Sequence, residues 1–453
     1  MRKFLLAFIS FLPVWFAGAQ SLLGTWNGNL QLGQTSLPLV VHLSEQGGEN
    51  KCLLDSPDQG AKGIVAILDF LSSDSLAFSV PALRASYRGS IQAGVLKGTF
   101  SQSGMKLQLD LKRGDYVRVR KQTPQPPLSY PTEEVTFENK EDHAVLSGTL
   151  SYPVTYLLKK KVPVVLLVTG SGHQNRDEEI LGHRPFAVLA DYLAKMGIAS
   201  LRYDDRGFGQ STGDISSATS QTFMKDALAG VDYLQSTGKF GKIGILGHSE
   251  GGMIAFMAVN ERPADVDFIV SLAGTALRGD QILLKQNENL LSAHPQTAPI
   301  CTAYCQVLDK IFQHLIADRP VTDVQNVVQQ YQKAVGSDLP PGALQNLEAV
   351  LRTGTPWFKY FLSYDPLPVI SKVTCPVMAI NGELDKQVDA QTNLDAIRKH
   401  LPENSQHQIK SYGGLNHLFQ SCTTGAVEEY GRIEETISPK VLSDIAQWIL
   451  QFK

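Results

Sequence analysis

The stretch that most limits the fold of this chain is residues 242–257, KIGILGHSEGGMIAFM. Two apolar runs lie on either side of Gly247-His248-Ser249-Glu250-Gly251-Gly252. This pattern is typical of a strand that turns sharply into a helix with a serine at the turn. Gly247 and Gly251 leave out side chains that would clash there. The turn is therefore predicted to expose Ser249 at the carboxyl end of a sheet, with the free N–H groups of the following helix beside it.

The same Gly-x-Ser-x-Gly pattern occurs a second time, at Gly209-Gln210-Ser211-Thr212-Gly213. It follows the charged run Asp204-Asp205-Arg206, and polar residues continue from 214 to 221. No strand is predicted to lead into this copy, and no helix is predicted to leave it directly. The context predicts a surface loop for Ser211 and a nucleophile at Ser249.

Length and charge limit the classes of protein that fit. A chain of 453 residues exceeds one typical core, so two or three domains are expected. A formal net charge of −3 gives no electrostatic reason to expect nucleic acid or an anionic membrane surface as a partner.

The first twenty residues have the features of a targeting segment. Arg2-Lys3 is positive, residues 4–16 are apolar, and Ala17-Gly18-Ala19 supplies small residues. This predicts a signal peptide, residues 1–19, and an exported protein, periplasmic or secreted. The alternative is an uncleaved anchor, but the apolar run is short for a bilayer, so stable membrane insertion is not expected.

The cysteines do not suggest a disulfide-built scaffold. There are five of them, so at least one is unpaired within a chain. Cys301 and Cys305 are four residues apart on a predicted helix, but no histidine or further cysteine lies close in sequence. We therefore predict that these cysteines do not form a metal site.

Residues 20–118 have the pattern of an all-β domain, a small antiparallel barrel or sandwich. The strand-like runs are 24–28, 37–43, 63–68, 76–80, 85–91, 95–100 and 105–111. Trp26 is expected in the core rather than at a ligand, although binding of a glycan or self-association stays open for this domain. Residues 119–132 contain four prolines and are predicted to form a semi-rigid linker.

From residue 133 to 453 strands alternate with helices, which predicts an α/β domain with a mostly parallel sheet and helices on both faces. Between residues 279 and 365 the strands stop and helical patterns follow. An insert at this point is expected to cover the carboxyl ends of the strands as a cap. Aromatic residues near its end line an acyl pocket or attach the cap to the core, and both roles stay open: Trp357, Phe358, Tyr360, Phe361 and Tyr364.

A serine nucleophile needs a histidine base and an acid that orients it. Asp385 follows the strand predicted at 376–380, and His417 follows the strand predicted at 407–412, so both belong at the same edge of the sheet as Ser249. Glu383 and Asp389 are weaker candidates for the acid. The other histidines are less suitable: His400 and His407 precede the last strand, and His248 is expected to be a packing residue or pocket wall.

Two backbone N–H groups are needed to stabilise the oxyanion. One is predicted from Glu250, directly after the nucleophile, and the other from Ser171, with Gly172 as the alternative, in the glycine-rich turn after the strand at 163–168. No P-loop lysine follows that turn, which argues against phosphate binding.

The chain from about 133 to 453 resembles the α/β-hydrolase superfamily, and most of all the exported bacterial carboxylesterases of its serine-aminopeptidase-like branch. The residues that carry the resemblance are Gly170-Ser171-Gly172, Arg176-Asp177-Glu178, Tyr203 to Gly209, Gly247 to Gly252, Gly382 with Asp385, and Asn416-His417. Thr169 departs from the pattern, since relatives often have histidine there. The resemblance implies ester hydrolysis without metal or cofactor. It also implies that Arg176 and Asp177 form a pair at the site rim or, preferably, a buried salt bridge that fixes the loop.

Three functions are compatible with these residues. The preferred one is a serine carboxylic-ester hydrolase acting on small or medium esters through an acyl-enzyme. The second is an aminopeptidase-type enzyme with the same triad, which would need carboxylates to hold the substrate ammonium; Asp309 and Glu348 in the cap are acids of unknown placement. The third is a glycan- or partner-binding protein without activity.

Overall fold

A computed structural model describes residues 22–32, 35–59, 61–116, 120–156 and 161–452 of the chain. The chain divides into two compact units, Met1–Arg118 and Val119–Lys453. The predicted signal peptide, residues 1–19, lies outside the described residues.

The first unit is a closed antiparallel barrel, as the sequence predicted, in which each strand pairs with the next and the first with the last. Its strands are β1 (Gly24–Leu32), β2 (Thr35–Gln46), β3 (Glu49–Ser56), β4 (Ala61–Leu71), β5 (Ser75–Val80), β6 (Ala85–Gln92), β7 (Val95–Gln102) and β8 (Met105–Arg113). Closure pairs the backbone groups of both edge strands, which in an open sheet would be left without partners.

Aliphatic side chains and a few large aromatic ones fill the interior of the barrel. Trp26 is buried, and its indole N–H donates to the carbonyl of Leu22 at 2.8 Å. Tyr87 is buried beside Phe78, and its hydroxyl donates to the carbonyl of Leu96. Both polar groups are satisfied inside the core, so the prediction that Trp26 is a core residue is confirmed.

The second unit contains one mixed eight-stranded sheet in the order β16-β15-β14-β13-β11-β12-β10-β9. The strands are β9 (Thr132–Asn139), β10 (Ala144–Ser151), β11 (Val162–Val168), β12 (Ala199–Tyr203), β13 (Phe240–His248), β14 (Phe268–Leu272), β15 (Val377–Gly382) and β16 (Gln408–Tyr412). Strand β10 is antiparallel to both neighbours, whereas β11 to β16 are mutually parallel. Strands β11 and β14 are buried along their whole length and β13 from Ile243 to His248, which explains their continuous apolar sequences.

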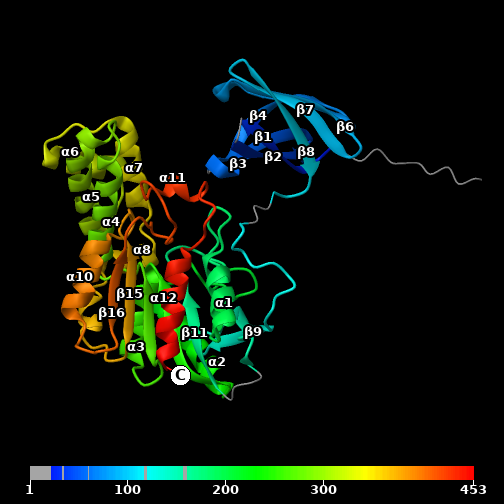
Figure 1. Cartoon of the computed structure of the whole chain (residues 1–453). Coiled ribbons are helices and arrows are strands. Elements are labelled where there is room, and N and C mark those ends of the chain that lie inside the picture. Colours follow the sequence, from blue (N-terminus) through cyan, green and yellow to red (C-terminus); the bar gives the residue numbers. More distant parts are fainter. Residues whose placement is uncertain (1–21, 33–34, 60, 117–119, 157–160, 453) are drawn as a thin grey trace, which may run out of the picture. The chain divides into compact units, whose positions relative to one another are not determined.

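Helices cover both faces of this sheet (Figure 1). One face packs against α1 (Pro185–Met196) and α12 (Pro439–Ile449). The other packs against α2 (Ser220–Ser236), α3 (Glu250–Glu261) and α10 (Ala390–His400). Helices α2, α10 and α12 bury an apolar stripe on the sheet, whereas α3 is buried on all sides from Glu250 to Val259.

The predicted cap is a group of helices with a core of its own, inserted between β14 and β15 (Figure 1). Its helices are α4 (Gly279–Ser292), α5 (Cys301–Ile316), α6 (Val324–Val335), α7 (Pro341–Arg352) and α8 (Pro356–Ser363). A short helix, α9 (Leu367–Ile370), leads back to the sheet.

The start of the proline-rich segment is attached to the second unit and is not a free spacer there. Arg120 is buried and donates to the carbonyls of Leu181, Gly431 and Ile433. The amide group of Gln122 bonds to the backbone of Ile437. The composition predicted a semi-rigid linker. It could not reveal that Arg120 would anchor this linker to the loop before α12.

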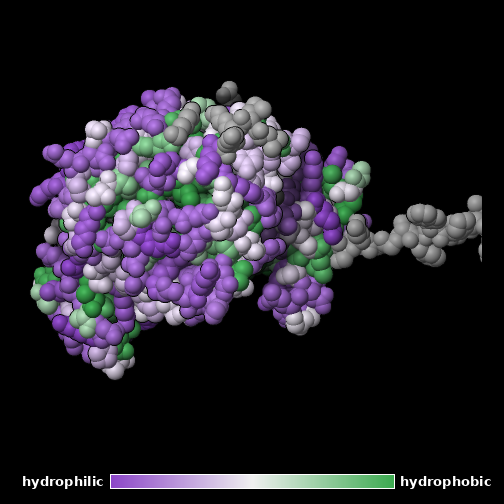
Figure 2. Space-filling view, turned by 90° about the horizontal axis from the view of Figure 1, so that it is seen from below, coloured by the Kyte–Doolittle hydropathy of each residue, from purple (hydrophilic) through white to green (hydrophobic). Residues whose placement is uncertain are grey.

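The face shown in Figure 2 is mainly hydrophilic, with apolar residues in scattered groups. Within the described part of the chain, none of the helices has both the length and the hydropathy needed to cross a bilayer.

Candidate active site

Ser249 occupies a strained turn between β13 and α3. Its backbone has φ 54° and ψ −120°, a conformation that L-residues with a side chain rarely adopt. Its N–H donates to the carbonyl of Leu272 at 2.8 Å, which ties the turn to the neighbouring strand. The strain places the serine where the strand ends and the helix begins, so that its side chain is only half-buried.

The glycines on either side of Ser249 are required by close backbone contacts. A Cβ atom on Gly247 would lie 2.0 Å from the carbonyl oxygen of Gly251. A Cβ atom on Gly251 would lie 2.2 Å from the carbonyl oxygen of Val168. Gly251 therefore lets the first turn of α3 approach the end of β11, directly before the predicted oxyanion loop.

Asp385 and His417 are brought together, although 32 residues separate them in the chain. Their side chains are buried and joined by a hydrogen bond of 2.6 Å between Asp385 Oδ2 and His417 Nδ1. The other carboxylate oxygen accepts the backbone N–H groups of Gln387 and Val388, which fixes the orientation of Asp385. Since an ionised carboxylate can only accept, Nδ1 carries the proton and Nε2 is left available as a base.

The rival acids and histidines have other partners. Glu383 accepts from the hydroxyl of Ser411, and Asp389 caps helix α10 by accepting from the N–H of Thr392. His407 Nδ1 accepts from the N–H of Val377, the first residue of β15. It thus lies at the amino end of that strand, whereas Asp385 follows its carboxyl end.

The loop after β11 lies against Ser249. A Cβ atom on Gly170 would be 3.0 Å from Cβ of Ser249, and the N–H of Gly170 donates to Glu178 Oε1 at 2.7 Å. Ser171 is the next residue and Gly172 follows it with φ 109°. Ser171 and Glu250 are joined through their side chains, since Ser171 Oγ donates to Glu250 Oε2 at 2.7 Å.

A second loop, after β12, supports this one. Asp205 is buried and accepts from Thr169 Oγ1 and from the N–H of Gln174, both at 2.8 Å. Thr169, the departure from the family pattern, is therefore part of the loop's anchoring. Burial, with smaller contributions from the Glu178 and Glu250 carboxylates, raises the pKa of Asp205 to about 7.

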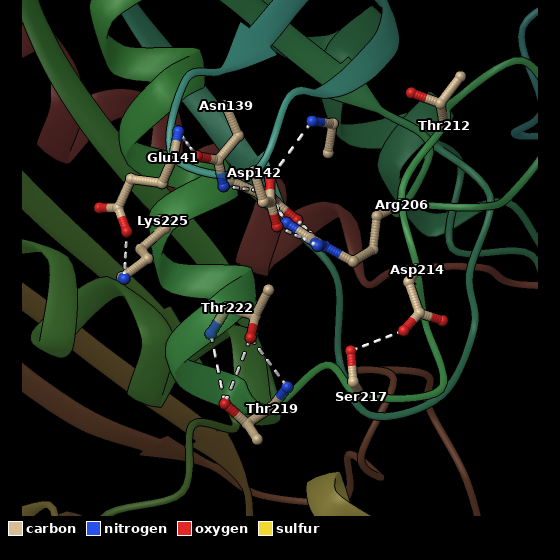
Figure 3. A network of polar contacts seen from close by, with 12 residues as sticks. Asn139, Glu141, Asp142, Arg206, Thr212, Asp214, Ser217, Thr219, Thr222 and Lys225 are labelled. Carbon is tan, nitrogen blue, oxygen red and sulfur yellow. Dashed lines mark hydrogen bonds and ion pairs between the residues drawn. The ribbon is translucent and has the colours of Figure 1, made fainter.

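The polar network in Figure 3 holds this second loop in place. Arg206 contacts Asp226 through two nitrogens, at 2.8 and 2.6 Å, and Asp142 at 2.7 Å. Asn139 donates to the same Asp226 carboxylate. The arginine therefore links the β9–β10 hairpin to helix α2, with its charge compensated by two acids.

Arg176 and Asp177 do not pair with each other, so the predicted pair is wrong. Arg176 bonds to Asp204 at 2.8 Å and also to Glu134, whereas Asp177 pairs with Arg202. Both side chains fix the loop after β11, but they attach it to different strands. The sequence places the two residues side by side, and only the packing of β9, β10 and β12 shows where their partners lie.

His248 forms a second histidine–carboxylate pair next to the first. Its Nδ1 lies 2.9 Å from Glu178 Oε1, and its Nε2 lies 3.0 Å from the backbone carbonyl of His417. The two imidazole rings pack at a centroid distance of 4.7 Å. Burial acts to lower the pKa of His248, but the Glu178 carboxylate outweighs it, and the pKa is raised above its ordinary value.

A cavity of about 270 Å³ contains the predicted nucleophile and base. Ser249 and His417 both line it, without a direct hydrogen bond between them among the described residues. Apolar side chains from the cap form much of its wall, and the polar part includes three glutamine amides. The apolar side chains of the cap are Ile282, Leu283, Trp357, Phe358 and Phe361, and the glutamines are Gln174, Gln286 and Gln387.

The aromatic residues of the cap divide between the wall of the cavity and the contact with the core. Trp357, Phe358 and Phe361 line the cavity, whereas Tyr360 and Tyr364 stack on each other and pack against the sheet-facing core. The indole N–H of Trp357 also donates to the Glu250 carboxylate, at 3.0 and 3.2 Å from its two oxygens. Sequence reasoning missed the role of the Glu250 side chain and that of Glu178, because neither forms its contacts with neighbours in sequence.

A metal centre is not evident in the described residues, which contain no group of three or more His, Cys, Asp or Glu side chains arranged to bind an ion. All five cysteines are unpaired.

Comparisons with known proteins agree with this architecture. Residues 183–353 match the family model described as serine aminopeptidase, S33, a span that includes Ser249 and most of the cap and ends before Asp385. Esterase EstD of Thermotoga maritima is 24% identical over 358 residues, which cover 79% of this chain and 74% of that protein. Because 358 residues are more than the second unit holds, this similarity extends into the first unit.

Similar solved structures include Est1E from Butyrivibrio proteoclasticus, in a complex with ferulic acid. It is 16% identical, with a TM-score of 0.40, and the match covers 68% of this chain and 95% of that one. Proline iminopeptidase of Mycobacterium smegmatis is 15% identical, with a TM-score of 0.42, over 71% of this chain and 98% of that one.

The second unit has a mixed sheet with one antiparallel strand inside it, a serine on a strained strand-to-helix turn and a cap after β14, which together are the α/β-hydrolase fold. The chain is a hydrolase with similarity to esterases.

Proposed function

We propose that this protein hydrolyses small or medium carboxylic esters through an acyl-enzyme formed on Ser249. The observation that carries the proposal is the buried Asp385–His417 hydrogen bond on the wall of the cavity that also contains Ser249. A base with one nitrogen occupied and the other free is what a serine nucleophile needs.

In the proposed reaction His417 Nε2 takes the proton of Ser249 as its Oγ attacks the ester carbonyl. The backbone N–H groups of Glu250 and Ser171 donate to the oxyanion. His417 then gives the proton to the leaving alcohol, and water attacks the acyl-enzyme in the reverse sense to release the acid. Asp385 keeps the imidazole in the required tautomer throughout.

Replacing Ser249 by Ala tests the proposal. We expect kcat on p-nitrophenyl acetate and butyrate to fall by about 10⁴-fold, and labelling by a fluorophosphonate probe to disappear. Ser211→Ala is the matched control, since it alters the serine of the other Gly-x-Ser-x-Gly and is expected to keep labelling and turnover. Unchanged turnover in the Ser249 variant would rule out the nucleophile.

The family description gives a reason to consider an aminopeptidase as the second candidate. Such an enzyme must hold the ammonium group of its substrate with carboxylates. Among the described residues that line the cavity, the only acid is Glu178, which is already paired with His248, and neither Asp309 nor Glu348 lines it. The lining therefore favours a neutral ester. A panel of aminoacyl-naphthylamides beside p-nitrophenyl esters separates the two functions, because a peptidase would prefer the amides.

We also propose that the protein is exported, on the basis of its first nineteen residues. The mature protein recovered from cell fractions is then expected to begin at Gln20 and to be found in the periplasm or medium. An intact N-terminus on a cytoplasmic protein would contradict export.

A further inference from the structure

The side chain of Glu250 has more partners than a residue that supplies only a backbone N–H would need. Its carboxylate is buried and accepts from Ser171 Oγ at 2.7 Å, from Ser220 Oγ at 2.6 Å and from Trp357 Nε1 at 3.0 Å. These donors belong to three separate segments: the loop after β11, the first turn of α2, and cap helix α8. One carboxylate thus joins the oxyanion loop, the core and the cap.

Burying a carboxylate at this point costs free energy. Burial raises the pKa of Glu250, and hydrogen bonds from Ser220, Trp357 and Ser171 act in the opposite direction. Each of the three donors therefore offsets part of the cost, and losing one leaves a buried acceptor less well satisfied. The position of the carboxylate is consequently sensitive to whether Trp357 is in place.

One face of the Trp357 indole stacks on Phe361, with a centroid distance of 5.6 Å, and the side chain also borders open space. It lines the active-site cavity, and it also lines a second cavity of about 210 Å³, whose other walls include Ile215, Phe223 and Thr355. Stacking on Phe361 restrains the plane of the ring, but the two cavities leave part of the side chain without packing contacts. The hydrogen bond to Glu250 is therefore a specific tie between the end of the cap and the catalytic centre.

We propose that the Glu250 carboxylate is a positioning residue that couples the docked position of cap helix α8 to the geometry of the oxyanion hole. With Trp357 docked, the carboxylate is held and in turn fixes Ser171, so that the N–H groups of Glu250 and Ser171 converge. When α8 withdraws, the carboxylate loses a donor and the loop after β11 loses its restraint. Catalysis is then efficient only while the cap covers the substrate. The inference rests on the proposed esterase function and adds a means of controlling it.

Three substitutions each remove one part of this connection and leave every backbone N–H in place. They are Glu250→Met, Ser171→Ala and Trp357→Phe, and Glu250→Gln is the conservative variant that still accepts one hydrogen bond and keeps the side-chain size. Misplacing an oxyanion donor costs less than removing it, so we expect kcat on p-nitrophenyl butyrate to fall by about 10- to 100-fold, with KM changed less than about threefold. Glu250→Gln should recover most of the loss.

Trp448→Phe is the matched control for Trp357→Phe. Trp448 is also a tryptophan whose N–H is hydrogen-bonded, to the carbonyl of Gln406, but it belongs to the core around α12. Trp448→Phe removes an indole N–H, as Trp357→Phe does, and is expected to leave kcat unchanged.

Inhibition by phenylboronic acid separates positioning from mere structural support. Its tetrahedral adduct on a serine places an oxygen in the oxyanion hole, so its Ki reports transition-state binding. We expect Ki to rise by the same factor by which kcat/KM falls in each variant, with the melting temperature of Trp357→Phe close to that of the unmodified protein.

The double variant Ser171→Ala/Trp357→Phe provides a test even if Glu250→Met does not fold. Both changes act through one carboxylate, so the combined loss in kcat should be close to the larger single loss. Independent losses that multiply would overturn the coupling. Wild-type kcat and Ki in Glu250→Met would also overturn it, whereas activity remaining in Ser249→Ala would instead refute the esterase proposal itself.

Discussion

The two copies of Gly-x-Ser-x-Gly share a sequence pattern and differ in every structural respect. Ser249 lies between a strand and a helix, with φ 54°, on the wall of a cavity. Ser211 lies in the loop after β12, where its buried hydroxyl donates to the carbonyl of Asp204 and accepts from the N–H of Ser147. The loop was predicted, but its serine is a buried structural residue and not a surface one.

The difference shows what makes a serine available for chemistry. The hydroxyl of Ser211 has both its donor and its acceptor capacity used by backbone groups, so it stabilises the loop and has nothing left for a substrate. Ser249 is held by its backbone alone, through the N–H bond to Leu272, and its side chain is left half-buried at the cavity.

Removing the imidazole of His417 should affect the chemistry of Ser249 and have no effect on Ser211. We expect His417→Ala to lower kcat on p-nitrophenyl esters by about 10⁴-fold, since Ser249 then has no proton acceptor. His173, whose ring bonds to the carbonyl of Arg206 beside the second pentapeptide, is the matched control, and His173→Ala should change kcat less than tenfold. Comparable losses in both variants would mean that the histidines were assigned wrongly.

Asp205 connects the regions around Ser211 and Ser249. It belongs to the loop that contains Ser211, and it supports the predicted oxyanion loop beside Ser249. Burial raises its pKa to about 7 in the folded protein, against an ordinary value of 3.8. At Asp205 the folded form therefore binds more protons than the unfolded form between about pH 4 and pH 7, so the contribution of this residue to stability should be fully present below this range and be lost as pH rises through it.

Asp205→Asn removes this titration. At each pH we take the free energy of unfolding of the unmodified protein minus that of the variant. We expect this difference to decrease by an amount on the order of 4 kcal/mol from pH 4 to pH 7. Urea unfolding at a series of pH values measures the difference. A difference that does not vary with pH would show that Asp205 titrates normally.

Gly251→Ala should disturb the pentapeptide around Ser249 through a clash with the backbone. The added Cβ meets the carbonyl of Val168, and neither group can turn aside, so α3 and the oxyanion loop must move apart. We expect a loss of about 1–3 kcal/mol in stability and about a hundredfold loss in kcat. Gly342→Ala, on cap helix α7 with open space around the new methyl group, should be tolerated without either loss.

Ser211→Ala should have the smallest effect, and on stability alone. The substitution leaves the buried N–H of Ser147 without its acceptor, which costs about 1–2 kcal/mol in thermal or urea unfolding. Turnover per folded molecule should not change. Ser363→Ala, at an exposed position at the end of α8, is the control and should lie within about 0.5 kcal/mol of the unmodified protein.

Much of the fold could be predicted from the sequence because its signals are local. Alternating runs with turns between them indicated the barrel, and fully apolar strands separated by amphipathic helices indicated the α/β sheet. The cap was recognisable because helical patterns continue from residue 279 to 365, where an alternating pattern would place the next strand. Asp385 and His417 could be proposed because each directly follows a strand, and parallel strands end at one edge of the sheet.

Other features depend on contacts between distant segments. The partners of Arg176 and Asp177 come from three strands, and the anchor at Arg120 reaches residues more than 300 positions away. The four hydrogen bonds of the Glu250 carboxylate come from residues as far apart as Ser171 and Trp357. No periodicity or spacing encodes such pairs, so only the assembled structure reveals them.

The residues next to Ser249 are enough to predict that one of the two Gly-x-Ser-x-Gly copies is a strand-to-helix turn, because the glycines and apolar runs around it act over a few residues. The surroundings of Ser249 depend instead on tertiary packing. Packing brings the Asp385 carboxylate and the His417 imidazole within 2.6 Å of each other, and it places a cap tryptophan on Glu250, the residue after Ser249. A strand or a turn is specified by neighbours in the chain, whereas a buried polar contact is specified by the segments that packing brings together.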